Sequence, residues 1–273
     1  MAARSAGNGR VGASAGAGRT ALITGASSGI GLDLASLFAA DHWNVVLVAR
    51  SEAKLREIAA GLARQNGIEA RALCADLSDP GAPQSITDRL SEHGVRVDAL
   101  VNNAGFGLSG PFVATDLDKE LEMIQVNVVA LTELTKLLLP GMVARRSGRI
   151  LNLASTAAFQ PGPLMAVYYA TKAYVLSFSE AIADELRDSG VTVTALCPGP
   201  TETGFSSRAG SEQSRLFKGP TMDARRVAEI GYAALMAGKP VVIPGLRNRI
   251  LAFSVRLAPR RVVTQIARRM QES

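Results

Sequence analysis

Short apolar runs alternate along this chain with longer segments in which apolar residues recur every three or four positions. The short runs are typical of buried strands, and the longer segments are typical of helices that cover a sheet. We expect strands at residues 21–24, 44–49, 70–75, 97–102, 149–154, 191–197 and 240–243, and helices at 29–40, 52–66, 84–92, 117–145, 167–188 and 223–236. This rhythm predicts an α/β fold: a doubly wound, Rossmann-like parallel sheet of about seven strands with helices on both faces.

Composition divides the 273 residues into three segments. Residues 1–19 are mostly Gly, Ala, Ser and Arg, lack the apolar core of a signal peptide and predict a disordered tail. Residues 20–245 carry the alternating elements and predict a single domain that includes a substrate loop at 200–220. Residues 246–273 mix seven Arg with apolar residues and form a basic, amphipathic C-terminal extension, which Pro259 splits.

The net charge of +6 lies at the two ends of the chain. Residues 1–19 contribute +3 and residues 247–273 contribute +6, so the body between them carries −3. A nucleic-acid partner requires basic side chains on the folded body, so none is expected. No run of eighteen apolar residues occurs, so no transmembrane helix is expected and the protein is predicted to be cytoplasmic.

Cysteine and histidine usage indicates a reducing compartment and no metal site. Cys74 and Cys197 both lie in apolar, strand-like runs, where we expect small buried thiols. Two Cys and two His, all separated, offer no cluster of metal ligands.

A glycine-rich turn follows the first predicted strand, in the run Thr24-Gly25-Ala26-Ser27-Ser28-Gly29-Ile30-Gly31. A strand, a glycine turn and a helix in succession can bind phosphate at the helix N-terminus. We expect Gly25 to permit a tight turn, Gly29 to let the backbone approach a pyrophosphate, and Gly31 to let the helix pack closely on the sheet. The spacing G-x-x-x-G-x-G differs from the generic G-x-G-x-x-G, and an ordinary strand–helix turn is the alternative.

Tyr168 and Lys172 are four residues apart in a predicted helix, which places both side chains on one face. A phenol has an unperturbed pKa of about 10, and a neighbouring ammonium would lower that pKa. Ser155 adds a hydroxyl that can hydrogen-bond a substrate oxygen, so the three residues predict a general acid/base site. The alternative is an amphipathic helix with a partly buried Tyr and a solvated Lys, and Tyr169 and Tyr174 are rivals for the acid role.

These motifs stand in one order with Asn102-Asn103-Ala104-Gly105, Asn127 and Pro198-Gly199. With these spacings the chain resembles the short-chain dehydrogenase/reductase (SDR) family over roughly residues 20–245. The resemblance implies an oxidoreductase that interconverts a carbonyl and an alcohol by hydride transfer to or from a nicotinamide cofactor.

The resemblance also implies roles for four catalytic residues. Tyr168 would transfer the proton, and Ser155 would donate to the same substrate oxygen. Lys172 would lower the pKa of Tyr168 and bind the nicotinamide ribose. Asn127 would hold a water that links Lys172 to solvent; alternatively it caps or bends the helix at 117–145.

The end of the second predicted strand indicates which nicotinamide cofactor is bound. An acid there would accept from the ribose 2′-OH of NAD, but this chain has Arg50, whose guanidinium can pair with a 2′-phosphate. Ser27 can add a hydroxyl. NADP(H) is therefore the predicted cofactor, and the alternative for Arg50 is a solvated residue at the start of a helix.

The remaining cofactor contacts are implied by the resemblance. Asp76 would accept from the adenine amino group, although it could simply form a turn. Thr201 and Thr203 would bind the carboxamide and phosphates, although they too could simply form a turn. The cofactor-binding set is Gly25, Ser27, Ser28, Gly29, Ile30, Gly31, Arg50, Asp76, Leu77, Asn103, Ala104, Gly105, Tyr168, Lys172, Pro198, Gly199, Thr201 and Thr203.

Substrate and partners are predicted less directly. Apolar side chains are expected around the reaction site, at Phe106, Phe159, Leu164, Met165, Phe205 and Phe217, unless they serve ordinary packing. They favour an apolar ketone, aldehyde or acyl substrate. Relatives commonly form homodimers or homotetramers through the helices that correspond to 117–145 and 167–188.

The C-terminal extension leaves two alternatives open. It can bind a membrane surface peripherally, or it can pack on the protein's own body or across a dimer.

The alternative to an enzyme is a cofactor-binding regulatory or membrane-peripheral protein of SDR fold that has little turnover.

Overall fold

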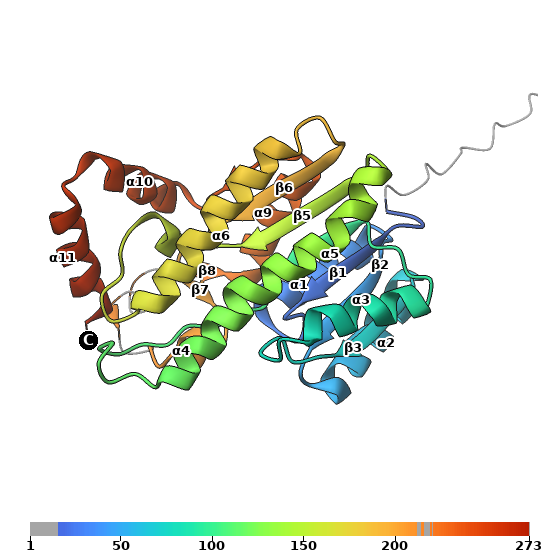
Figure 1. The fold of residues 1–273 in the computed structure, drawn as a ribbon, viewed down its shortest axis with the longest axis horizontal. Helices are drawn as coiled ribbons and strands as arrows, with labels where there is room; N and C mark the ends of the chain where they lie inside the picture. The colour runs from blue at the N-terminus through green and yellow to red at the C-terminus, as the bar shows by residue number, and fades with distance from the viewer. Residues whose placement is uncertain (1–15, 212–213, 216–218, 220, 273) are drawn as a thin grey trace, which may run out of the picture.

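The computed structural model describes residues 16–211, 214–215, 219 and 221–272, so the predicted tail lies outside the described residues except for 16–19. Seven parallel strands form one sheet in the order β3-β2-β1-β4-β5-β6-β9 (Figure 1). The strands are β1 (Thr20–Thr24), β2 (Asn44–Ala49), β3 (Ala70–Cys74), β4 (Ala99–Asn102), β5 (Gly148–Leu153), β6 (Val191–Leu196) and β9 (Val241–Val242). The predicted doubly wound sheet is confirmed. Its strand order reverses between β1 and β4, where such folds bind ligands.

Helices cover both faces of this sheet, as β1 illustrates. Ala21 and Ile23 pack in one apolar layer with α1 (Gly29–Ala40), α2 (Glu52–Asn66) and α9 (Ala224–Met236). Leu22 points the other way and packs with α3 (Ala82–Glu92), α5 (Ala130–Ala144) and α6 (Ala166–Glu185). Both faces are covered, so the strands are apolar at consecutive positions, and this is why they could be found in the sequence.

The helix predicted at 117–145 is interrupted in its middle. It consists of α4 (Leu117–Ile124), a π-helical turn at Gln125–Val129 and α5. By length and composition alone, Leu117–Ala144 could cross a membrane, with a mean hydropathy of 1.4, which the criterion of uninterrupted apolar runs missed. Its buried Asn127 and Thr135 hydrogen-bond other parts of the fold, and α5 packs on β5, as in the core helix of a globular protein.

The C-terminal extension forms two helices, α10 (Leu246–Ser254) and α11 (Arg260–Gln271), and Pro259 stands at the start of α11 as expected. Its apolar positions Val263 and Ala267 are buried, at 6% and 2% exposed. The extension therefore packs on the protein's own body, at the end of the molecule where α6 begins (Figure 1).

Several short elements escaped prediction because they are too short to show a periodic pattern. They are a 3-10 turn at Thr156–Phe159, a two-stranded parallel ribbon of β7 (Thr201–Glu202) and β8 (Met222–Asp223), and α7 (Phe205–Ala209).

The prediction of two buried thiols was half wrong. Cys197 is buried, but Cys74 is exposed, because it ends the edge strand β3.

Candidate active site

A cavity of about 1060 Å³ lies beyond the carboxyl ends of the strands. One part is bounded by the glycine turn after β1 and by the ends of β2 and β3. The other part is bounded by the start of α6 and by α10 and α11. Every residue predicted to bind the cofactor lines this cavity except Gly31.

The glycine turn has the backbone that its sequence predicts. Gly25 and Gly29 have φ of +65° and +55°, values that favour glycine. Gly31 was expected to let the helix pack closely on the sheet. In the structure, a side chain at Gly31 would instead collide with the Asn103 amide and the Gly25 carbonyl. Asn103 Nδ2 donates to the carbonyls of Thr24 and Gly25 at 2.9 and 3.2 Å, so the glycine turn is fastened to the loop after β4.

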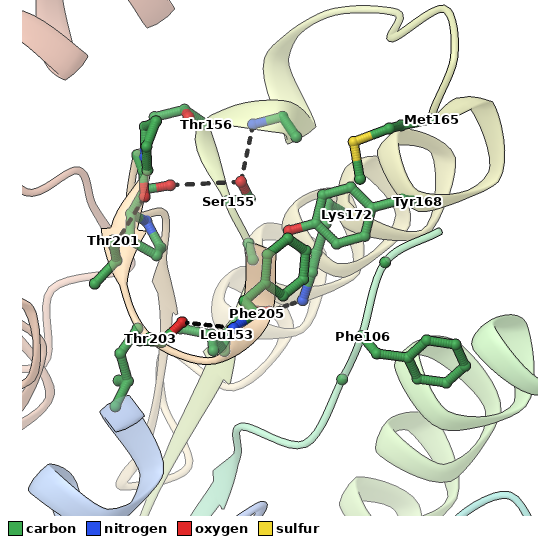
Figure 2. Close-up of a pocket in the computed structure, with 18 of the residues that line it drawn as sticks. Phe106, Leu153, Ser155, Thr156, Met165, Tyr168, Lys172, Thr201, Thr203 and Phe205 are labelled. Carbon is green, nitrogen blue, oxygen red and sulfur yellow. Dashed lines mark hydrogen bonds between the residues drawn. The ribbon is translucent and has the colours of Figure 1, made fainter. Parts of the chain in front are cut away.

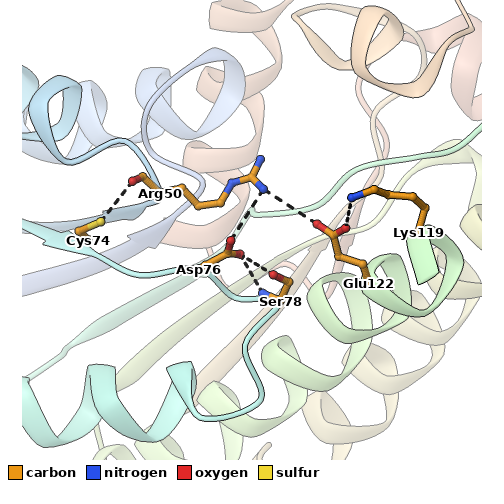
Figure 3. A network of polar contacts seen from close by, with 6 residues as sticks. All are labelled: Arg50, Cys74, Asp76, Ser78, Lys119 and Glu122. Atoms are coloured by element: carbon orange, nitrogen blue, oxygen red, sulfur yellow. Dashed lines mark hydrogen bonds and ion pairs between the residues drawn. The ribbon is translucent and has the colours of Figure 1, made fainter.

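Arg50 lines the first part of the cavity, and its side chain extends towards Asp76 and Glu122 (Figure 3). Its guanidinium is 3.9 Å from an Asp76 oxygen and 4.0 Å from a Glu122 oxygen, and 66% of the side chain is exposed. Burial raises the pKa of Asp76, but hydrogen bonds from Ser78 and the charge of Arg50 outweigh it, so this pKa is lowered. The Ser78 bonds show that Asp76 also forms the turn that was the alternative interpretation.

Glu122 and Lys119 were not predicted as part of this site. Lys119 Nζ donates to a Glu122 oxygen at 2.6 Å, and both residues line the cavity from α4. Their side chains form an ordinary ion pair three residues apart on a helix. Only the fold reveals that Glu122 of this pair also contacts Arg50.

Asn127 lies in the π-helical turn and is 1% exposed. Its Nδ2 donates to the Phe106 carbonyl at 3.0 Å and to the Thr171 hydroxyl at 3.1 Å, and its Oδ1 accepts from the Phe106 amide at 3.1 Å. A side chain at Gly105 would come within 2.9 Å of Asn127 Oδ1 and 3.6 Å of Lys172 Nζ. Asn127 and Lys172 therefore flank the same glycine.

Ser155, Tyr168 and Lys172 converge in the middle of the cavity (Figure 2). Ser155 follows β5; its hydroxyl accepts from the Ala157 amide at 3.1 Å and lies 3.4 Å from the Pro198 carbonyl, to which it donates. Lys172 Nζ donates to the Leu153 carbonyl at 2.7 Å and lies 5.8 Å from the centre of the Tyr168 ring. The predicted arrangement on one helix face is present.

Burial dominates the ionisation of this group. It raises the pKa of Tyr168 well above its usual value, although the nearby Ser155 hydroxyl lowers it. It lowers the pKa of Lys172 from 10.5 to about 8. The prediction that Lys172 gives Tyr168 a lowered pKa is therefore wrong for this structure, because removal of the phenol from water has the larger effect.

The two rival tyrosines have other partners. The Tyr169 hydroxyl accepts from Gln271 Nε2 at 2.7 Å, and Tyr174 is 40% exposed with its hydroxyl 3.0 Å from that of Thr132. Of the three, Tyr168 is the one beside Ser155.

The loop after β6 brings both predicted threonines to the cavity. Thr201 donates to the Gly199 carbonyl at 2.9 Å, as in the turn that was its alternative. Thr203 accepts from the Phe205 amide at 3.2 Å, and its methyl group lies against Gly29, where an added Cβ would be 3.1 Å away. Thr203 thus reaches the glycine turn.

The apolar residues predicted around the reaction site divide into two groups. Phe106, Met165 and Phe205 line the cavity, whereas Phe159 packs behind it in a separate apolar cluster. Leu164 is also absent from the described lining, and Phe217 lies outside the described residues. Residues from the C-terminal helices were missed, although their helical spacing was visible: Leu251, Val263, Ile266, Met270 and Gln271 line the cavity.

Comparison with known proteins agrees with this geometry. The family model described as short chain dehydrogenase matches residues 19–214. The chain is 35% identical over 237 residues to a very-long-chain 3-oxoacyl-CoA reductase of Anas platyrhynchos, covering 85% of this chain and 74% of the relative. It is 38% identical over 216 residues to sulfoacetaldehyde reductase 2 of Chromohalobacter salexigens, covering 77% and 85%. Its structure matches a short-chain dehydrogenase from Sphingobium yanoikuyae in complex with NADPH, with a TM-score of 0.79, 36% identity and coverage of 88% and 93%.

Proposed function

Because the chain belongs to the family of short-chain dehydrogenases, oxidoreductases that act on carbonyl or alcohol groups, we propose that it uses NADP(H) and Tyr168 to interconvert an apolar carbonyl compound and its alcohol. The observation that carries this proposal is the convergence of Ser155, Tyr168 and Lys172 in one cavity with the glycine turn.

The first part of the cavity fits a dinucleotide with a 2′-phosphate. Gly25 and Gly29 line the cavity beside the N-terminus of α1, where a phosphate would bind, and Ser27 and Ser28 add polar groups there. Arg50 would bind the 2′-phosphate, since its contacts with Asp76 and Glu122 are long and exposed and therefore weak. The structural relative from Sphingobium yanoikuyae was solved with NADPH, which supports this choice.

Bound NADPH would supply a hydride to the substrate carbonyl carbon. A raised pKa keeps the Tyr168 phenol protonated at neutral pH, so it can donate its proton to the carbonyl oxygen during reduction. Ser155 would donate a second hydrogen bond to the same oxygen, where negative charge develops.

Lys172 and Asn127 would supply the proton that Tyr168 loses. A pKa of about 8 leaves Lys172 mostly protonated at neutral pH, and its contact with the Leu153 carbonyl fixes the ammonium beside the Tyr168 ring. Asn127 flanks Gly105 together with Lys172, and a water held there would link the ammonium to solvent. Lys172 would also hold the nicotinamide ribose.

The second part of the cavity favours an apolar ketone, aldehyde or acyl substrate. Its walls include Phe106, Met165, Phe205, Leu251 and Met270. The relatives act on substrates as different as a very-long-chain 3-oxoacyl-CoA and sulfoacetaldehyde, so these walls, rather than the fold, must select the substrate.

Exposed apolar residues support two proposed contacts. On α4 to α6 they include Leu117, Leu121, Ile124, Val129, Leu137, Val143 and Tyr174. This exposure supports a homodimer or homotetramer, which light scattering can detect. On α10 and the turn after it they include Leu246, Ile250, Phe253 and Leu257 among Arg residues, which supports peripheral contact of a cytoplasmic protein with a membrane.

NADPH oxidation with a panel of ketones, aldehydes and acyl thioesters tests the proposed function. Turnover of any member, lost in Tyr168→Phe, is the expected result. A panel without turnover while NADPH binds tightly would contradict it and would favour a cofactor-binding regulatory protein.

A further inference from the structure

The C-terminal helix α11 forms one wall of the substrate part of the cavity. Val263, Ala267 and Gln271 follow one another at intervals of four residues and are 6%, 2% and 5% exposed. Ile266 and Met270 line the cavity beside them, while the arginines of α11 are exposed. One face of an amphipathic helix thus lines the cavity, and the basic face meets solvent.

Gln271 is the polar member of this buried face. Its Nε2 donates to the Tyr169 hydroxyl at 2.7 Å, across 102 residues of sequence, and both side chains are buried. Gln160 is also close enough to hydrogen-bond this hydroxyl. Tyr169 directly follows Tyr168 on α6, and their ring centres are 6.1 Å apart. A second link runs close by, from the Arg215 amide to the Glu272 carbonyl at 3.2 Å.

We infer that α11 is a substrate wall fastened to the catalytic helix by the Gln271–Tyr169 hydrogen bond, and that this tie determines how well the cavity holds a long apolar substrate. Gln271 is then a positioning residue for substrate, not for the proton transfer. The inference rests on the proposed function for the identity of the substrate part.

The two ends of a substrate should respond differently to loss of the tie. The carbonyl end contacts Tyr168 and Ser155, and neither of them takes part in the Gln271–Tyr169 hydrogen bond, so kcat with a short ketone should stay unchanged. The far end of a long ketone would lie against Ile266 and Met270 of α11. A looser α11 therefore weakens binding of long substrates only.

Gln271→Leu is a variant that should fold. The Gln271 oxygen is buried without a hydrogen-bond partner among the described residues, so the change removes an unpaired polar atom along with the bond. Gln265→Leu on the exposed side of α11 is the matched control. Tyr169→Phe removes the bond from the other side while keeping the ring.

Steady-state kinetics with linear methyl ketones of increasing chain length test the inference. In Gln271→Leu we expect KM for the longest ketone to rise about five- to tenfold, the equivalent of one net hydrogen bond, with kcat for the shortest within about twofold. Tyr169→Phe should raise KM for the longest ketone by a similar factor. The double variant Gln271→Leu/Tyr169→Phe should raise it no further, because both changes remove the same hydrogen bond, and Gln265→Leu should match wild type. An equal rise in KM at every chain length, or additive effects, would overturn the inference.

A binding measurement separates this inference from the proposed function. Nile red, a neutral apolar fluorophore, should bind Gln271→Leu about fivefold more weakly than wild type or Gln265→Leu, whether or not any ketone is reduced. Equal binding of Nile red by all three proteins would overturn the inference that the Gln271–Tyr169 hydrogen bond holds α11 as a substrate wall. The proposed function is decided separately, by whether the wild-type protein reduces the ketones.

Discussion

Replacement of Arg50 by Gln should shift the cofactor preference from NADPH towards NADH. The Arg50 side chain is 66% exposed and its two carboxylate contacts, at 3.9 and 4.0 Å, are each worth less than about 1 kcal/mol, so little competes with a phosphate. Hydrogen bonds to a charged group contribute about 1.5–3 kcal/mol. The Arg50→Gln variant would lose most of this free energy with NADPH and none of it with NADH.

That free energy corresponds to a fall of about ten- to a hundredfold in kcat/KM for NADPH. The assay is initial-rate kinetics with each cofactor at a saturating concentration of one reducible carbonyl compound. Arg56→Gln is the matched control, since Arg56 is a similarly exposed arginine on α2 outside the described cavity lining. An unchanged NADPH-to-NADH ratio in Arg50→Gln would refute the assignment of Arg50 to the 2′-phosphate.

Three further predictions address the lysine, the glycine turn and the outer surface. The folded-state pKa of Lys172, about 8, is below its usual value of 10.5, so the folded state binds fewer protons between these values and stability rises with pH there. Urea unfolding should show this rise in wild type but not in Lys172→Met, which should be inactive yet more stable at pH 7 by up to about 3 kcal/mol. Gly31→Ala should lower the free energy of unfolding by about 1–3 kcal/mol and weaken NADPH binding, because the added methyl group meets Asn103 and the Gly25 carbonyl. An unchanged melting temperature and an unchanged Kd for NADPH would contradict this prediction. Phe253→Ser with Leu257→Ser should reduce sedimentation with anionic liposomes, and pelleting equal to wild type would remove the membrane contact; point variants are preferable to truncation, which would also remove the cavity wall.

Most of the sheet could be predicted because its pattern is local. Strands such as β1, where residues 21–24 are buried on both faces, show as continuous apolar runs, and the glycine spacing after β1 shows where a left-handed backbone is needed. The two-residue strands β7 and β8 carry no such pattern. Cys74 illustrates a related limit, since nothing local shows that its strand lies at the edge of the sheet.

Most residues of the site could be predicted from the sequence, but their pKa values could not. The helical spacing of Tyr168 and Lys172 places them together, but the pKa of each depends on burial by segments far away in the sequence. Gln271 could not be found for the same reason, because its partner Tyr169 is 102 residues away. Phe159 was placed wrongly because a buried aromatic residue near a site has the same local pattern as one that lines it.

Proton transfer by Tyr168 is tested most directly by the kcat of Tyr168→Phe for carbonyl reduction, measured beside its Kd for NADPH. The variant keeps the ring that packs beside Phe205 and removes only the hydroxyl. We predict a fall in kcat of about a hundred- to ten-thousandfold while NADPH still binds, whereas Tyr174→Phe, altered at an exposed tyrosine, retains full activity. A Tyr168→Phe protein that keeps more than a few per cent of the wild-type kcat would contradict the account.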